Sequence, residues 1–246
     1  MRKRLLPCLA AALLPAFAHA DPPDFDRPGA GFATSVLPAG TVALEQGIPS
    51  WEREDGQATY TTDSLVRIGL GGPAELQLGG SLYSHLYGKG EHVSGRDDSS
   101  LGLKLAPGDD GGAFSYAVLG QLTFADGKRD IGNGARQYTL GTTLGWKLDG
   151  DRQVSVLVNL DRLRGANTWT VAPVYTVPVT DHLSAYVETD LIHDGEEGNQ
   201  ALAGGGLALT MGDHVQADTY VLHRVGPRGT EWQAGLGLSV YFGKPR

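Results

Sequence analysis

Apolar residues alternate with small or polar residues along most of the chain beyond residue 40, most clearly in the closing stretch Glu231–Phe242. A β-strand places successive side chains on opposite faces, so this stretch predicts a strand that is apolar on one side only. It is long enough to cross a membrane, because a tilted spanning strand needs about 9–11 residues. The apolar face holds Trp232, Ala234, Leu236, Leu238, Val240 and Phe242, and the other face holds Gln233, Gly235, Gly237, Ser239 and Tyr241.

The same alternation recurs along the chain and predicts an all-β protein, a single antiparallel up-and-down transmembrane β-barrel. We expect about 12 strands, an even number as in bacterial single-chain barrels. Closure of the barrel requires the last strand to pair with the first, near Thr41–Ile48. The predicted strands are 41–48, 59–69, 74–84, 99–106, 113–124, 136–148, 152–161, 168–178, 182–192, 200–211, 214–224 and 231–242.

The predicted connections alternate between long and short. Long ones include Pro49–Ala58 and Ala125–Ala135, and tight ones include Asp149–Asp151 and Gly212–Asp213. Short periplasmic turns and longer outer loops are typical of outer-membrane barrels. Aromatic residues are expected near both ends of the apolar faces, as in the belts at membrane interfaces. Pro173 falls inside a predicted strand and predicts a local bulge, because proline cannot donate to the ladder.

The first 20 residues read as a secretory signal peptide. Arg2, Lys3 and Arg4 precede the apolar run Leu5–Phe17, and Ala18–Ala20 forms a small-residue cleavage site. We therefore expect export and location in the bacterial outer membrane. The single cysteine, Cys8, lies within this signal, so the mature chain offers no thiolate for catalysis, a disulfide or a metal.

Charge and hydrophobicity narrow the possible functions. Removing the three basic signal residues leaves 17 basic against 28 acidic residues, which argues against a nucleic-acid partner. A hydrophobic fraction of 41% is low for a helical membrane protein but compatible with a barrel, where alternate residues face lipid. Residues 21–40 contain four prolines and precede the predicted barrel of residues 41–246. This segment could hang in the periplasm, bind a partner there, or fold into the lumen.

A family resemblance rests mainly on the start of the mature chain. Asp26-Arg27-Pro28 is followed by Thr34, Pro38 and Gly40, and then by Leu44-Glu45-x-Gly47. This opening resembles the proteins labelled putative MetA-pathway of phenol degradation, often called transporters. The resemblance implies an outer-membrane barrel that passes small organic molecules, and it carries over no catalytic residue. One departure is Ile48–Trp51, which replaces the polar-aromatic continuation usual in that family.

Charged residues on the faces opposite the apolar ones are the candidate lumen-lining residues. Charges of both signs inside a barrel either set solute selectivity or form ion pairs that fill a narrow lumen. The sequence leaves both open. We expect no catalytic residue, metal or cofactor. The candidates are Glu45, Asp63, Arg67, Glu75, Lys104, Lys147, Glu188, Asp190 and Asp218.

The favoured function is an outer-membrane channel for passive uptake or export of small solutes, aromatic and hydrophobic ones included. One alternative is a lipid- or ester-modifying barrel enzyme using His85, His193 or His223 with Ser84 and nearby acids, although no nucleophile elbow or metal-binding spacing supports it. Another is a structural barrel whose loops bind a ligand. The expected partners are outer-membrane lipid and lipopolysaccharide, the small solute, and the barrel-insertion machinery, which would recognise the C-terminal strand.

Overall fold

The computed structural model describes residues 24–107, 112–195 and 198–243, and the regular structure in these ranges is β-strand. None of the described residues belongs to a helix that is long and apolar enough to cross a membrane. The strands are β1 (Val42–Glu54), β2 (Gln57–Gly71), β3 (Ala74–Gly88), β4 (Glu91–Gly95), β5 (Ser100–Leu105), β6 (Phe114–Thr123), β7 (Gln137–Lys147), β8 (Gln153–Leu163), β9 (Ala166–Pro178), β10 (Leu183–Asp194), β11 (Gly198–Met211), β12 (Val215–Arg224) and β13 (Trp232–Phe242).

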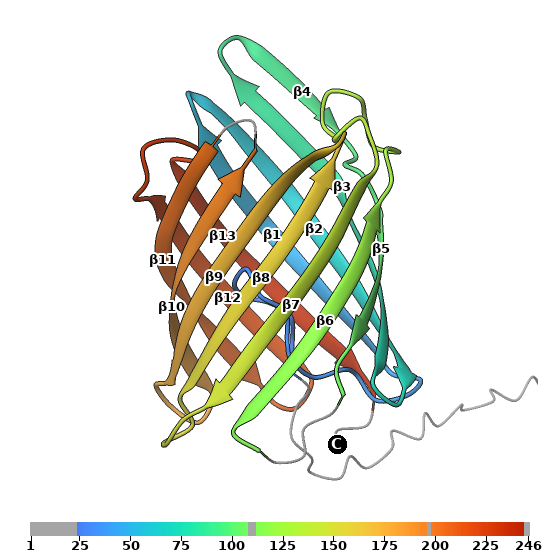
Figure 1. The fold of residues 1–246 in the computed structure, drawn as a ribbon, viewed down its shortest axis with the longest axis vertical. Coiled ribbons are helices and arrows are strands. Elements are labelled where there is room, and N and C mark those ends of the chain that lie inside the picture. Colours follow the sequence, from blue (N-terminus) through green and yellow to red (C-terminus); the bar gives the residue numbers. More distant parts are fainter. Residues whose placement is uncertain (1–23, 108–111, 196–197, 244–246) are drawn as a thin grey trace, which may run out of the picture.

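Twelve of these strands form one closed antiparallel barrel, and β4 pairs only with β3 in a hairpin that rises above the rim (Figure 1). The barrel closes where β13 pairs with β1, from Val42 opposite Phe242 to Arg53 opposite Trp232. The predicted fold and its closure are therefore confirmed. We call the end where β1 begins and β13 finishes the terminal end, and the opposite end the loop end.

The two faces of the barrel wall differ as the alternation predicts. In β13, Leu236 and Phe242 are 54% and 57% exposed on the outside, whereas Ser239 and Tyr241 are buried on the inside. Leucine, valine and aromatic side chains are exposed in the same way around the wall. An apolar outer surface of this extent belongs in lipid, because soluble monomers rarely expose large contiguous apolar patches.

The predicted ends of several strands are wrong. The predicted alternation of long and short connections is therefore also wrong in part. The strand β1 does not stop at Ile48: it continues to Glu54 and turns through Asp55-Gly56 into β2. A register shift between Gly47 and Ser50 accommodates Pro49 within the strand. Because the strands extend further towards the loop end than predicted, the connections at that end include both two-residue turns and the long segment 124–136.

The bulge predicted at Pro173 is also absent. Pro173 lies opposite Val156 of β8, and the register of that ladder is continuous on both sides. Towards β10 the register is likewise unchanged, and pairing is merely interrupted between Val174 and Val171. The missing N–H of proline therefore costs ladder hydrogen bonds locally without inserting an extra residue.

Candidate functional site

Residues 24–38, which we call the lumen segment, run inside the barrel before the chain enters β1 (Figure 1, blue coil). Its backbone and side chains contact inward-facing residues on well-separated strands. The backbone N–H of Asp26 donates to Glu45 of β1, and that of Ala30 donates to Glu188 of β10. The segment therefore crosses the lumen and does not follow one wall.

A buried ion cluster anchors the beginning of the segment. At its centre, the Arg67 guanidinium donates to Glu45 and Glu75 at distances of 2.8 Å each, and all three side chains are fully buried. Arg67 also donates to the main-chain oxygen of Asp24 at 2.9 Å. A guanidinium offers several donors in a fixed plane, so a single Arg67 can hold two wall carboxylates and the segment together.

The carboxylate of Asp26 completes this cluster from the segment side. It accepts hydrogen bonds from Lys104 at 2.8 Å and from Gln77 at 2.7 Å, and it lies 3.3 Å from Arg67. Burial opposes ionisation of this carboxyl group, but the charges of Arg67 and Lys104 outweigh it and hold the pKa of Asp26 below its usual range. Asp26 is therefore an ionised anchor at neutral pH.

A second ion pair ties the segment to β12, which is separated from β1 by β13 alone. Arg27 donates to both carboxylate oxygens of Asp218 in β12, at 3.0 and 3.3 Å. Burial works against the charged form of Arg27, but Asp218 outweighs it and raises the pKa of Arg27. Gly237, on the lumen face of β13, leaves room for this ion pair. A Cβ atom at that position would lie 2.4 Å from Asp218 Oδ2 and 2.5 Å from Arg27 Nε.

Backbone donors of the segment bind further wall residues. Phe32 N–H donates to Thr143 Oγ1 at 3.2 Å, and Leu37 N–H donates to Glu75 at 2.9 Å. Gly29 precedes the Ala30–Glu188 contact with a φ of +101°, and a Cβ atom there would lie 2.7 Å from a Glu188 oxygen. The chain can pass this close to β10 because residue 29 is glycine.

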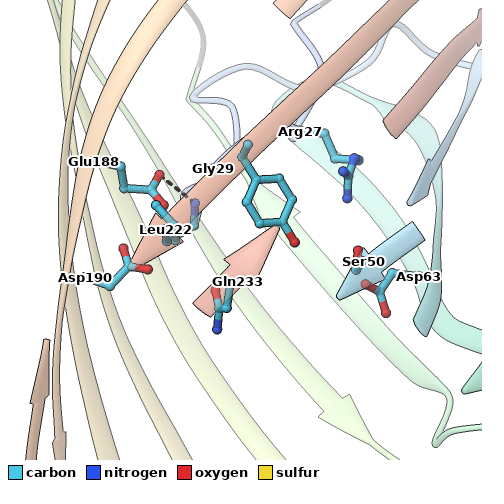
Figure 2. Close-up of a pocket in the computed structure, with 10 residues that line it drawn as sticks. Arg27, Gly29, Ser50, Asp63, Glu188, Asp190, Leu222 and Gln233 are labelled. Carbon is cyan, nitrogen blue, oxygen red and sulfur yellow. Dashed lines mark hydrogen bonds between the residues drawn. The ribbon is translucent and has the colours of Figure 1, made fainter. Parts of the chain in front are cut away.

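Two cavities flank the lumen segment, and Arg27 and Gly29 line both. The larger, of about 510 Å³, is lined by segment residues and by side chains near the terminal ends of the strands, such as Lys147, Thr176 and Gln216. The smaller, of about 150 Å³, is lined by Asp63, Glu188 and Asp190 together with residues of β1, β12 and β13 (Figure 2). The segment thus separates two cavities within one lumen.

The nine candidate residues chosen from the sequence fall into distinct groups in the structure. Four of them, Glu45, Arg67, Glu75 and Lys104, belong to the ion cluster. Asp218 holds Arg27, whereas Lys147 is exposed and lines the larger cavity. The remaining three, Asp63, Glu188 and Asp190, gather at the smaller cavity.

Sequence reasoning missed the segment's own functional residues. Asp26 and Arg27 entered only as part of a family-like opening, although each pairs with a charged wall residue. The number of inward-facing charges could have indicated these residues. Buried charges need partners, and a narrow lumen has little room for water to supply them.

A family model described as Putative MetA-pathway of phenol degradation matches residues 25–242. The chain belongs to this family. The matched residues include nearly all of the lumen segment and the whole barrel, so both parts of the structure belong to the region that defines the family. No curated protein sequence matches the chain.

Solved structures similar to this family member are outer-membrane barrels. An outer membrane channel from Pseudomonas putida F1 aligns with a TM-score of 0.68 and 11% identity, over 88% of this chain and 99% of the channel. The KdgM porin in complex with disordered oligogalacturonate has a TM-score of 0.58 and 10% identity, over 82% and 99%. The NanC porin has a TM-score of 0.56 and 11% identity, over the same shares. At these identities the likeness shows the fold alone, an outer-membrane type of β-barrel.

In this MetA-pathway family member, the three histidines considered for catalysis, His85, His193 and His223, do not lie in the arrangement of a hydrolase triad. In the described chain, His193 Nδ1 lies 2.7 Å from Asn199 Oδ1, and His223 Nδ1 lies 2.6 Å from the main-chain oxygen of Arg224. Ser84 Oγ is buried and contacts Ser81 Oγ at 3.3 Å. His85 contacts Ser94 Oγ at 2.6 Å and stacks on Tyr83 and Tyr87. These contacts give no support to nucleophilic catalysis.

Proposed function

We propose that this protein is a passive outer-membrane channel for small solutes and that the lumen segment closes it. The observation that carries the proposal is the position of residues 24–38, which cross the lumen and bind the wall through side chains and backbone donors. Cavities on both sides of the lumen segment support a solute path through the barrel that the segment interrupts.

The size and lining of the cavities favour small solutes with an aromatic part over large hydrophilic ones. Hydroxyl-bearing residues such as Ser115 and Thr143 line the larger cavity together with Phe32 and Tyr186. A mixed lining of this kind provides aromatic faces for contact and scattered polar groups for orientation. This agrees with uptake or export of small solutes that include aromatic ones.

Single-channel recording of the refolded mature protein in planar bilayers tests the proposal. Deleting residues 21–38, so that the chain begins at Ala39, should produce frequent open steps, whereas the full mature chain should stay mostly closed. Removing the segment also exposes Arg67 and Lys104 to water, so their charges no longer need Asp26 as a partner. Absence of any conductance step in the deleted, folded protein would rule out the channel.

Export and insertion complete the proposal. Residues 1–20 would direct secretion, and cleavage after Ala20 would leave Asp21 as the first residue, which intact-mass measurement of the purified protein can check. The outer face would contact outer-membrane lipid and lipopolysaccharide, and β13 would be the strand that the insertion machinery recognises. A mature mass that still includes residues 1–20 would contradict this route.

A further inference from the structure

The smaller cavity is distinguished by its acidic wall. Glu188 and Asp190 lie two residues apart on β10 and face the same side, with Asp63 of β2 across the cavity (Figure 2). Tyr220, Leu222, Gln233 and Ser50 complete the wall, and Arg27, Gly29 and Ala30 of the lumen segment close it.

The positive charge at this cavity is already engaged elsewhere. Arg27 is paired with Asp218 through two hydrogen bonds, and Arg67 and Lys104 are held in the ion cluster. Within the described ranges, the salt bridges of the structure do not include Asp63, Glu188 or Asp190. Asp63 lies near enough to Arg27 to help raise the pKa of that guanidinium, whereas Glu188 and Asp190 form no salt bridge among the described residues.

Asp190 provides an independent sign that a ligand group is missing. It is 6% exposed, and its Oδ1 atom has no hydrogen-bond partner in the described part of the chain. Buried carboxylate oxygens are ordinarily satisfied, so an unpartnered one that lines a cavity points to a donor supplied from outside. Glu188 is 4% exposed and accepts from Ala30 N–H.

We propose that this cavity is a binding site for the cationic group of a small organic amine. Two neighbouring carboxyl groups repel each other when both are ionised, and an ammonium group between them removes that repulsion and donates to Asp190 Oδ1. The Tyr220 ring on the wall adds an aromatic face for a cation or a ring. A volume of about 150 Å³ matches a benzene-sized molecule.

The inference rests on the proposed channel function, because it names the class of solute that the lumen selects. It also couples solute and closure, since Glu188 holds Ala30 of the lumen segment at the edge of the same cavity. A bound amine that draws the Glu188 carboxylate towards itself competes with the Ala30 N–H for the same oxygen atoms.

Isothermal titration calorimetry on the full mature protein in detergent at pH 7 tests the site. The probes are protonated benzylamine, neutral benzyl alcohol and anionic benzoate, which share a ring and differ in charge. Benzylamine should bind at least tenfold more tightly than benzyl alcohol, and benzoate should not bind. Equal affinity for the amine and the alcohol would overturn the proposal.

Matched variants locate the binding. Asp190→Asn and Glu188→Gln should each weaken benzylamine binding at least tenfold while retaining the size of the side chain. Asp161→Asn is the control, because Asp161 accepts from Gln137, Thr139 and Asn159 on another part of the wall. Unchanged binding in Asp190→Asn, with the barrel folded by its heat-modifiable gel mobility, would refute the site.

The two proposals fail separately. Conductance in the protein lacking residues 21–38, without benzylamine binding by the full mature chain, would refute the amine site and leave the channel standing. Binding of benzylamine without conductance in the deleted protein would refute the channel, and the cavity would then be a ligand site in a closed barrel.

Discussion

Substituting Asp26 by alanine should loosen the lumen segment without disturbing the barrel wall. The side chain lies in the segment and takes no part in strand pairing, and its carboxylate accepts from Lys104 and Gln77 on β5 and β3. The substitution therefore removes two hydrogen bonds and the ion pair with Arg67 between the segment and the wall, and it leaves the ladders intact.

The size of the effect follows from these contacts. A hydrogen bond to a charged group contributes roughly 1.5–3 kcal/mol, so the loss of two makes docking of the segment weaker by about 3 kcal/mol at the lower end. Every 1.4 kcal/mol changes an equilibrium by about tenfold, so the undocked population should rise by about 100-fold. If undocking opens the channel, open probability should rise by a similar factor.

Single-channel recording at neutral pH measures this directly, and Asp24→Ala is the matched control. The Asp24 carboxylate accepts from Ser35 Oγ within the same segment, and the wall contact of Asp24 uses its main-chain oxygen, which alanine keeps. Asp24→Ala should therefore resemble the unmodified protein. Equal open probability in both variants would refute the view that the ion cluster holds the segment closed.

Three further predictions address acid sensitivity, the membrane face and assembly. The pKa of Asp26 is lowered, so its ionised form stabilises the docked segment at neutral pH, and this stabilisation is lost as the pH falls through that pKa. The open probability of the channel should therefore rise below about pH 4, and the Asp26→Ala variant should lack this rise. Leu236→Arg on the outer face should lower stability in lipid vesicles by about 2–4 kcal/mol in urea titrations, whereas Gln233→Arg on the lumen face should change it little. Phe242→Ala should reduce the assembled barrel in outer-membrane fractions several-fold, and Phe114→Ala, an exposed aromatic at the same end, should not; equal loss in both would deny β13 a special part in insertion.

The architecture could be predicted from the sequence because a barrel wall imposes a strict period of two. In β13 this period placed Leu236 outside and Ser239 inside, as the structure has them. Strand ends could not be predicted as well. Pro49 resembled the end of a strand, yet a register shift lets β1 continue past it, and such a shift depends on the neighbouring strands β13 and β2.

The sequence predicts which wall residues line the candidate site but not how they pair. The alternation of apolar and polar residues identifies which charged residues face the lumen, but it does not say which of them pair. Pairing depends on the lumen segment, which shows no such alternation. Arg67 meets Asp26 across 41 positions, and Arg27 meets Asp218 across 191. Asp190 Oδ1 has no hydrogen-bond partner among the described residues, and the nearby cations Arg27 and Arg67 are paired with other carboxylates.

The distribution of the anchors along the chain has a consequence for the order of folding. The partners of Asp26 and of the Arg67 cluster lie on β1, β2, β3 and β5, within 78 positions of the segment, whereas Glu188 and Asp218 lie 158 and 191 positions away. Closing short loops costs less entropy than closing long ones, so the early strands can gather around the segment first. The later strands then close the wall around an interior that is already filled.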